Sequence, residues 1–453
     1  MAFDASSMMK VVSVFGLGKL GAVIAGCYAS RGFRVIGVDV NQRCVEECNR
    51  GVAPVQEPGI EDLYRRSGQN LGATSDGVSA VEQSDATLIV VPTPSEADGG
   101  YSLRYVLETC KVVGEALRNK KRYHLVVLKS TVLPGSCDKH ILRVLEDESG
   151  RRCGIDFGFC YNPEFVALGS VISNLFNPDL VLIGESDTTA GDRLLDIHAR
   201  LLDAKRPRAR MSLVNAEVTK LAVNTYVTMK ITYANLLARI CERLPGGDVD
   251  VVTAALGLDS RIGAKYLKGG LGYGGPCFPR DNQALLCLTR RLGIPFPLAE
   301  ATDQVNRGIP AQVAALITSK APAGGSIAIL GLSYKPNTSE VEESQSVLIS
   351  QILAECRFDV TVYDPVAMES ARLVLGDRVK YAESAQACVA KADVVVVATP
   401  WDEFTEIDFV SQAGSSGPVV IDCWGILDGT KQRSSAVVRL GAHASRGRYE
   451  LDG

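Results

Sequence analysis

One segment near the N-terminus constrains the fold more than any other. Residues 10–15 (KVVSVF) form a β-favouring run, and a glycine-rich stretch, residues 16–21 (GLGKLG), follows at once. A run of small, helix-favouring residues comes next, and a second apolar run, residues 33–38, ends at Asp39. This order predicts a parallel β-α-β unit that opens an α/β domain with a doubly wound sheet.

The three glycines have the spacing that a dinucleotide site requires. Gly16 would permit a tight turn, Gly18 would let backbone approach a pyrophosphate, and Gly21 would let the helix pack on the strand. The anion would lie against free N–H groups at the helix N-terminus. Asp39 can accept from both ribose hydroxyls and would repel a 2′-phosphate, so NAD is favoured over NADP. A glycine-rich turn in another α/β unit is the alternative.

Two later strand-like runs also end in polar turn residues. Residues 86–91 lead into Pro92-Thr93-Pro94, and residues 124–128 lead into Lys129-Ser130-Thr131. In open α/β sheets a ligand lies at such carboxyl ends of strands. Thr93 and Thr131 are therefore candidate contacts, although each hydroxyl alone fits a plain turn.

Length and composition exclude several classes of protein. At 453 residues the chain predicts two or three domains. A net charge of −4 offers no basic surface for nucleic acid, and no apolar run reaches the roughly 18 residues of a membrane span. The 13 cysteines form no CxxC pair and the four histidines fall in no motif. We therefore expect no metal site, no disulfide framework and a reducing, cytoplasmic compartment.

A long helical stretch, residues 215–244, lies in the middle of the chain. Lys220 and Asn224 are four positions apart and hence neighbours on one helix face. Their apolar surroundings indicate that this face is covered, and a buried lysine needs a partner, for which Asp281 is a candidate. The length of the stretch suits a spine between domains or a dimer interface.

The segment GGLGYGGPCFPRDNQAL, residues 269–285, distinguishes one cysteine from the others. Cys277 follows a run of glycines, past which a bulky ligand can approach closely, and precedes Asp281 by four residues. If Pro279 opens a helix, the thiol lies near the positive end of a helix dipole, which favours the nucleophilic thiolate. A buried cysteine beside a tight turn is the alternative.

The last third of the chain repeats the plan of strands that end in polar turns. Strand-like runs occur at residues 326–330, 358–363, 393–398 and 418–422, and the polar residues 335–344 predict a loop. Without the glycine fingerprint, this part predicts a second Rossmann-type domain that binds a different nucleotide-like group.

Taken together, these motifs give the chain a resemblance to the UDP-glucose/GDP-mannose dehydrogenase family along essentially its whole length. The motifs, in order, are VFGLGKLG, EPG, VPTP, KSTVLPG, YNPEF, NPDLVLIG, the KLAVN helix, SRIGAKYLKGGLGYGGPCFPRD and GLSYKPNT. The resemblance implies two Rossmann-like α/β domains joined by a long central helix in an all-α middle region. It divides the chain into an NAD-binding domain (1–206), a helical dimerisation region with the cysteine loop (207–318) and a nucleotide-sugar-binding domain (319–453).

The family oxidises the C6 alcohol of a nucleotide sugar to a carboxylate with two NAD⁺. An alcohol loses hydride once a base takes its proton, whereas an aldehyde must first add a nucleophile. The resemblance gives that addition to Cys277, through a thiohemiacetal and then a thioester. GYGGPCFPRD resembles the UDP-glucose branch more than the GVGGHCIPVDP of the acetamido-sugar branch, so UDP-glucose is the expected substrate. GDP-mannose, a UDP-N-acetylhexosamine, or binding with impaired catalysis are the alternatives.

The resemblance assigns further roles. Lys220 would stabilise negative charge on the C6 oxygen, with Asn224 as a donor beside it. Asp281 would position a water and pair with Lys220. Thr131 matches an active-site threonine, and Glu164 a carboxylate that helps to hydrolyse the thioester.

The remaining expected contacts fall into two sets. Those to NAD are Gly16, Leu17, Gly18, Lys19, Leu20, Gly21, Asp39, Pro92, Thr93, Pro94 and Thr131. Those to the nucleotide sugar are Glu164, Phe165, Lys220, Asn224, Arg261, Lys268, Tyr273, Gly274, Tyr334 and Lys335. In the family the residue at the position of Arg261 often acts from the neighbouring subunit, so a homodimer or higher homo-oligomer is expected.

Three positions depart from the family pattern. Leu168 stands where a second glutamate is usual, and Glu342 stands where an arginine approaches the cofactor. Trp424 lies in a segment whose arginine usually approaches the nucleotide. A lost cationic partner weakens anion binding by about one to a few kcal/mol where it is buried and unreplaced. These departures bear on which nucleotide sugar is bound and on the hydrolytic step.

Overall fold

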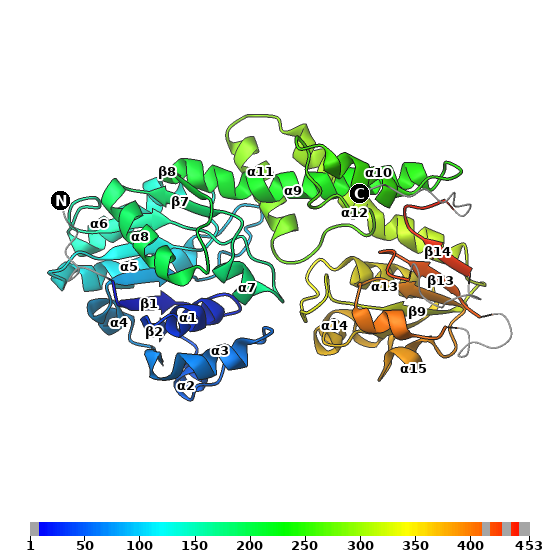
Figure 1. The fold of residues 1–453 in the computed structure, drawn as a ribbon, viewed down its shortest axis with the longest axis horizontal. Coiled ribbons are helices and arrows are strands. Elements are labelled where there is room, and N and C mark those ends of the chain that lie inside the picture. The colour runs from blue at the N-terminus through cyan, green and yellow to red at the C-terminus, as the bar shows by residue number, and fades with distance from the viewer. Residues whose placement is uncertain (1–8, 410–416, 428–435, 444–453) are drawn as a thin grey trace. The chain divides into compact units, whose positions relative to one another are not determined.

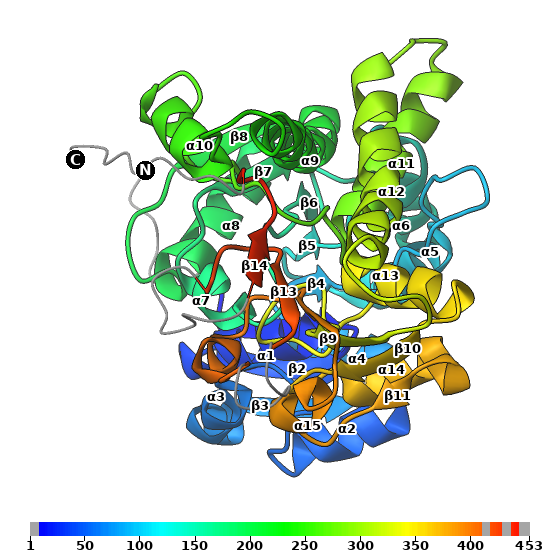
Figure 2. The ribbon, with the colours of Figure 1, turned by 90° about the vertical axis from the view of Figure 1, so that its right-hand side faces the viewer.

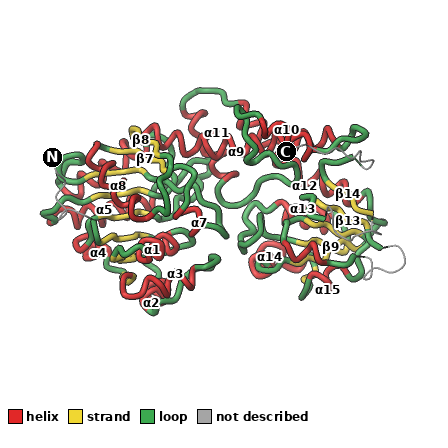
Figure 3. The backbone as a smooth tube through the Cα atoms, in the orientation of Figure 1, coloured by secondary structure: helices red, strands yellow, loops and turns green. Residues whose placement is uncertain are grey.

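The computed structural model describes residues 9–409, 417–427 and 436–443, which divide into two compact units, Met1–Ala222 and Val223–Gly453. The boundary falls inside helix α9 (Leu213–Cys241), which has 29 residues and confirms the long central helix expected at 215–244. Each unit contains one sheet with helices on its faces (Figures 1 and 3).

The first unit is built on an eight-stranded sheet of order β3-β2-β1-β4-β5-β6-β7-β8. Neighbouring strands are parallel except for the antiparallel pair β6–β7. The strands are β1 (Val11–Phe15), β2 (Arg34–Val38), β3 (Leu71–Thr74), β4 (Ala86–Ile89), β5 (Leu125–Leu128), β6 (Gly158–Tyr161), β7 (Val181–Glu185) and β8 (Arg208–Ser212). The helices are α1 (Gly21–Ser30), α2 (Gln42–Asn49), α3 (Ile60–Ser67), α4 (Gly77–Gln83), α5 (Arg104–Asn119), α6 (Leu142–Ser149), α7 (Val171–Phe176) and α8 (Thr188–Leu201).

Both faces of this sheet are buried, because successive side chains of a strand point to opposite sides. Along β5, Leu125 and Val127 join a core that includes residues of α1 and α8. Val126 and Leu128 join a separate core that includes residues of α5 and α6. The central strands β4, β5 and β6 are therefore buried at every residue, as in other parallel sheets covered on both sides, whereas the edge strands β3 and β8 are less buried.

The second unit contains an all-parallel six-stranded sheet of order β11-β10-β9-β12-β13-β14. Its strands are β9 (Ser326–Leu330), β10 (Asp359–Tyr363), β11 (Lys380–Tyr381), β12 (Val394–Val397), β13 (Val419–Asp422) and β14 (Ala436–Arg439). Helices α13 (Gln345–Glu355), α14 (Met368–Leu375) and α15 (Ala385–Val389) flank it (Figure 2). Before the sheet come α10 (Val249–Leu258), α11 (Phe278–Arg291) and α12 (Pro297–Thr318).

The two sheets share a plan that fixes where ligands bind. In each, the chain order reverses between the first and fourth strands, β1 and β4 in one unit and β9 and β12 in the other. Ligands of open α/β sheets lie outside the carboxyl ends of the strands at such a switch point. The expected fold class, two doubly wound α/β sheets with helices between them in the chain, is confirmed, and residues 335–344 form a loop as expected.

Candidate active site

The turn after β1 has the geometry of a dinucleotide cradle. Gly16 has φ +92°, and a Cβ on it would lie 2.8 Å from the Val90 carbonyl oxygen. A Cβ on Gly21 would lie 1.8 Å from Gly16 O, so the helix can begin there only with glycine. Around Gly18, by contrast, no described atom lies within 4 Å of such a Cβ, which leaves that side of the turn open to a ligand.

Helix α1 offers its N-terminus to an anion. Within the described residues, no side chain caps it and no acidic residue stands in its first turn. Leu20 is its N-cap residue, and Lys19 is exposed beside it. Backbone N–H groups at such an end bind phosphate, so these residues fit a dinucleotide.

Asp39, after β2, holds the edge of this cradle. Its Oδ2 accepts from Leu17 N at 2.6 Å and its Oδ1 from Asn41 N at 2.8 Å, and the residue is half-buried. The corresponding residue of the second sheet, Asp364, is 1% exposed and accepts from Leu332 N and Ser333 N. The half-buried Asp39 therefore lies where a ribose can reach it, whereas the buried Asp364 accepts hydrogen bonds from the turn after β9.

The turns after β4 and β5 are joined at the switch-point edge of the first sheet. Thr93 Oγ1 donates to Thr131 O at 2.9 Å, and Ser130 Oγ donates to Val91 O at 2.6 Å. Thr93 is buried, whereas Pro92 and Pro94 beside it are exposed. The structure thus brings the two candidate threonines together, because β4 and β5 are neighbouring strands of the sheet.

Glu164, after β6, is paired with a lysine that sequence reasoning did not single out. Lys129 Nζ contacts Glu164 Oε1 and donates to Asn162 Oδ1 at 2.8 Å. The side chain of Lys129 is fully buried and that of Glu164 is 13% exposed. The one signal in the sequence was a lysine directly after a buried strand, and its partner depends on the register of β5 against β6.

Lys220 meets the same segment from α9. Its Nζ donates to Glu164 O at 2.8 Å and lies 4.5 Å from the centre of the Phe165 ring. Lys220 is 6% exposed, which confirms that this helix face is covered. The expected pairing of Lys220 with Asp281 joins residues of different units and stays a prediction.

Cys277 directly precedes α11, and Pro279 lies in the first turn of that helix, as expected. Of the 13 cysteines only Cys277 and Cys356 are exposed, and no disulfide joins any of them. Cys356 follows the C-terminus of α13, the end of a helix dipole that disfavours a thiolate. Burial raises the pKa of Cys110 to about 12 and of Cys153 to about 11, so those thiols stay protonated. Cys277 is thus the best-placed nucleophile.

The first turn of α11 also carries Asp281. Its amide donates to Cys277 O at 2.8 Å, and its Oδ2 accepts from Asn224 Nδ2 at 2.5 Å. Asp281 is 4% exposed and Asn224 is 8% exposed. The structure therefore places three predicted site residues, Cys277, Asp281 and Asn224, in one hydrogen-bonded group.

The glycines before Cys277 are packed against the protein's own atoms. A Cβ on Gly275 (φ +81°) would lie 2.7 Å from the Tyr334 ring, and one on Gly274 would lie 2.3 Å from Glu343 O. The backbone of Tyr273 exchanges two hydrogen bonds with the Asn306 amide, at 2.8 and 3.0 Å. The run of glycines thus fixes the approach to Cys277 by close packing.

The remaining substrate candidates are more exposed. Lys335 Nζ lies 6.0 Å from the centre of the Tyr334 ring, and both residues are half-buried. Lys268 is exposed, and the Arg261 side chain is 86% exposed and paired with Asp259 at 2.5 Å.

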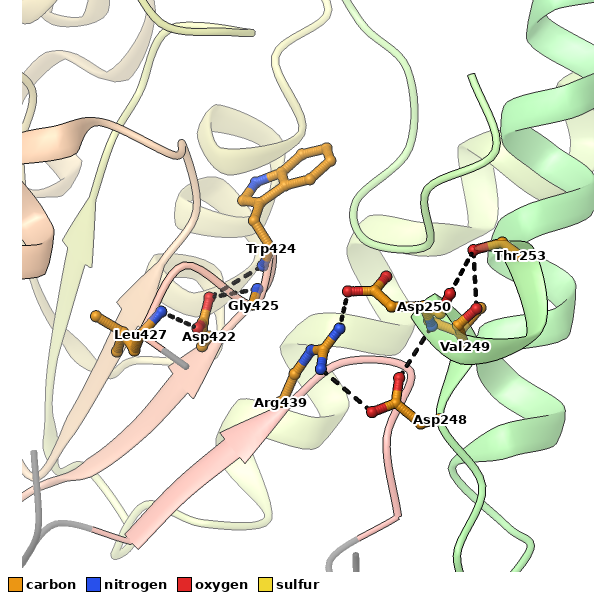
Figure 4. Close-up of polar contacts among 9 residues, drawn as sticks. All are labelled: Asp248, Val249, Asp250, Thr253, Asp422, Trp424, Gly425, Leu427 and Arg439. Atoms are coloured by element: carbon orange, nitrogen blue, oxygen red, sulfur yellow. Dashed lines mark hydrogen bonds and ion pairs between the residues drawn. The ribbon is translucent and has the colours of Figure 1, made fainter. Parts of the chain in front are cut away.

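The departures from the family pattern have clear local structures. Leu168 packs against the core on the α1 side of the first sheet, and Glu342 is exposed. After β13, the buried Asp422 accepts from Trp424 N at 3.0 Å and from Gly425 N at 2.9 Å (Figure 4). The Trp424 indole donates to Ala398 O at 2.8 Å and lies over Gly270, where a Cβ would be 3.0 Å from the ring.

Arg439 is a cation close to the turn that contains Trp424, and it is paired with two carboxylates. Arg439 on β14 forms ion pairs with Asp248 and Asp250 at the N-terminus of α10, and its side chain is 9% exposed (Figure 4). A Cβ on Gly425 would lie 2.6 Å from the Arg439 guanidinium. Arg439 thus adjoins the Trp424 turn but its charge is compensated within the protein.

The described ranges contain neither a cluster of His, Cys, Asp and Glu side chains that could hold a metal ion nor a helix long and apolar enough to cross a membrane.

Comparison with known proteins accounts for this arrangement. Three models of the UDP-glucose/GDP-mannose dehydrogenase family match: its NAD binding domain over residues 9–202, its central domain over 214–308 and its UDP binding domain over 328–429. A UDP-glucose 6-dehydrogenase of Haloferax volcanii is 37% identical, covering 88% of this chain and 93% of the relative. A GDP-mannose 6-dehydrogenase of Pseudomonas aeruginosa is 34% identical over 92% of this chain and 97% of the relative.

A solved structure agrees. The UDP-glucose dehydrogenase of Pyrobaculum islandicum superposes with a TM-score of 0.87 at 36% identity, covering 99% of this chain and all of that one. Two doubly wound sheets, one with a dinucleotide cradle, thus define an NAD-dependent oxidoreductase. This chain belongs to the UDP-glucose/GDP-mannose dehydrogenase family.

Proposed function

We propose that this protein oxidises UDP-glucose at C6 to UDP-glucuronate, with two NAD⁺ consumed for each sugar. The observation that carries the proposal is the exposed Cys277 thiol at the N-terminus of α11, one turn before the Asp281–Asn224 pair. A nucleophile in that position is required for the second oxidation and would be superfluous for an enzyme that stops at the aldehyde.

The turn 16–21 and Asp39 would hold NAD⁺, which when bound would supply the hydride acceptor for both oxidations. In the first, Lys220 and Asn224 stabilise the C6 oxygen as its proton leaves to water held by Asp281. In the second, the Cys277 thiolate adds to the aldehyde to give a thiohemiacetal, whose oxidation gives a thioester. Glu164 takes a proton from the water that hydrolyses the thioester, and Thr131 contacts the reacting groups.

The cofactor and substrate contacts are part of the proposal. The turn 16–21, Asp39 and the segments around Thr93 and Thr131 bind NAD. Phe165, Lys268, Tyr273, Gly274, Tyr334 and Lys335 bind the nucleotide sugar. The division into domains at 1–206, 207–318 and 319–453 is kept as a proposal; residues 1–8 and 444–453 lie outside the described ranges.

A homodimer is also proposed. On α9, Tyr226, Tyr233 and Ile240 recur every seven residues and are 57%, 53% and 54% exposed. A stripe of this period suits packing against the same helix of a second copy. Arg261, exposed in one subunit, would then bind the sugar in the other. The absence of disulfides among so many cysteines supports a reducing, cytoplasmic setting.

Trp424 motivates a second candidate substrate. An indole in place of an arginine removes a phosphate partner and adds a flat apolar surface, which favours a different nucleotide or sugar. GDP-mannose and UDP-N-acetylhexosamines are the alternatives with the same chemistry. Binding without turnover is a further alternative, motivated by Leu168, Glu342 and Trp424.

A panel of nucleotide sugars tests the proposal. The purified protein is incubated with NAD⁺ and each of UDP-glucose, GDP-mannose, UDP-N-acetylglucosamine and UDP-N-acetylmannosamine, and NADH absorbance is recorded. We expect the largest kcat/KM with UDP-glucose. A larger kcat/KM with another sugar would reassign the substrate. Tight binding of a sugar with no NADH formed from any of them would refute the proposed enzymatic activity.

A further inference from the structure

A buried chain of hydrogen bonds ends on the Glu164 carboxylate. Lys129 follows β5 and Asn162 follows β6, and the register that pairs Leu128 with Tyr161 brings them side by side. Lys129 Nζ donates to Asn162 Oδ1 at 2.8 Å and contacts Glu164 Oε1.

The other end of the chain is anchored in α8. His198 Nε2 donates to Asn162 Oδ1 at 2.9 Å, and Asn162 Nδ2 donates to Leu182 O at 2.8 Å. Burial, and then the charge of Lys129, lowers the pKa of His198 to about 3, so the imidazole is neutral near pH 7. Asn162 is therefore held from three sides and in turn fixes the Lys129 ammonium.

The two lysines that meet Glu164 act on different atoms. Lys220 Nζ donates to the main-chain oxygen of Glu164, whereas Lys129 contacts its carboxylate. The Lys129 ammonium is fully buried and the Glu164 side chain is 13% exposed. The ammonium therefore compensates the negative charge of the carboxylate and fixes the direction in which the carboxylate points. A buried ion pair adds little net stability over apolar side chains of the same volume, so orientation is its main physical effect.

We propose that Lys129 is a positioning residue for thioester hydrolysis: held by Asn162 and His198, it aims the Glu164 carboxylate at the attacking water. The inference rests on the proposed function. In the step, the water oxygen bonds to the thioester carbon and its proton passes to Glu164. The C–S bond then breaks, and its electron pair leaves with the Cys277 sulfur as a thiolate.

A double-mutant cycle tests this role. Lys129→Met, Glu164→Gln and the double variant are compared with the wild type in rapid-mixing experiments with UDP-glucose and NAD⁺. The NADH burst reports oxidation to the thioester, and the steady-state rate reports hydrolysis once that step is slow. We expect each single variant to keep its burst and to lose roughly 10²-fold in steady-state rate. The double variant should fall no further than about twofold below Glu164→Gln, because Lys129 acts through Glu164.

Three results would overturn the inference: losses that multiply in the double variant, a Lys129→Met enzyme with the wild-type steady-state rate, or a Glu164→Gln enzyme that hydrolyses normally.

Asn162→Ala, which loosens Lys129 without removing its charge, should show a smaller loss in the same step and provides a second variant if Lys129→Met does not fold. Unfolding midpoints of the wild type, Lys129→Met, Glu164→Gln and the double variant report how much the ion pair contributes to stability. A wild type that makes no NADH would refute the proposed function and this inference with it, whereas an active wild type with multiplying losses would refute this inference alone.

Discussion

Asn224 donates a 2.5 Å hydrogen bond to the Asp281 carboxylate and so joins the long helix α9 to the first turn of α11. The Asp281 amide in turn donates to Cys277 O. Any water or substrate group that Asp281 holds therefore lies one helical turn from the thiol. This linkage gives Asp281, which is proposed to hold the proton-accepting water, and Cys277, the proposed nucleophile, a common rigid support.

Cys277→Ser should abolish formation of the acid, with a fall of roughly 10³-fold or more in kcat, because a hydroxyl is a poor substitute for a thiolate. The matched control is Cys356→Ser, which changes the other exposed cysteine at the opposite kind of helix end. It should retain wild-type kcat. Steady-state NADH formation measures both, and an active Cys277→Ser enzyme would remove this sulfur from the mechanism.

Asp39→Ala should weaken NAD⁺ binding about 10- to 100-fold, since it removes a charged acceptor and leaves Leu17 N unpaired in the turn. Asp39→Asn keeps one oxygen for Leu17 N and should lie between the wild type and Asp39→Ala. Calorimetric titration gives the dissociation constants. UDP-glucose binding should change less than about twofold; an equal loss for both ligands would mean that the first sheet does not hold the cofactor.

Gly275→Ala should destabilise the protein more than Gly293→Ala. Both residues have positive φ, +81° and +69°, so both pay the same kind of backbone penalty of about 1–2 kcal/mol. A Cβ on Gly275 also meets the Tyr334 ring, which adds roughly 1–3 kcal/mol, whereas no described atom lies within 4 Å of one on Gly293. Urea unfolding measures the difference in unfolding free energy. Equal losses would show that the loop around Gly275 accommodates the added methyl group with no further loss of stability.

His198 should make the folded state less stable in acid. Its folded pKa of about 3 lies below the roughly 6.5 of an unfolded histidine, so between these values the unfolded chain binds more protons. The stability contribution is complete above about pH 6.5 and declines by up to about 1.4 kcal/mol per pH unit as the pH falls toward 3.

His198→Gln keeps a donor for Asn162 but cannot titrate, so its unfolding free energy should fall less steeply with pH. Urea unfolding at about pH 7.5, 6 and 5 compares the two slopes. His124, whose pKa burial also lowers, is present in both proteins and cancels. Parallel slopes would show that His198 does not titrate on unfolding.

The local part of the site could be predicted from the sequence. The turn from Gly16 to Gly21 and the helix after Cys277 depend on neighbouring residues, whose conformations follow from glycine and proline geometry. The positions of Thr93 and Thr131 in turns after two strands of the first sheet were also expected from the sequence.

The rest depends on register and packing. Lys129 meets Glu164 only because β5 and β6 pair in one register, and nothing in either segment alone specifies that pairing. The glycines before Cys277 were expected to make room for a ligand, and their neighbours Tyr334 and Glu343 are more than fifty residues away in the chain. Such contacts between residues far apart in the chain cannot be predicted from single motifs.

The most direct test of the central claim is the number of NADH molecules formed for each UDP-glucose consumed, measured to completion with the product identified by mass spectrometry. Because Cys277 carries the aldehyde through a second oxidation, we expect two NADH for each sugar and UDP-glucuronate as the product. One NADH with release of the aldehyde, or consumption of the sugar with no NADH, would contradict this claim.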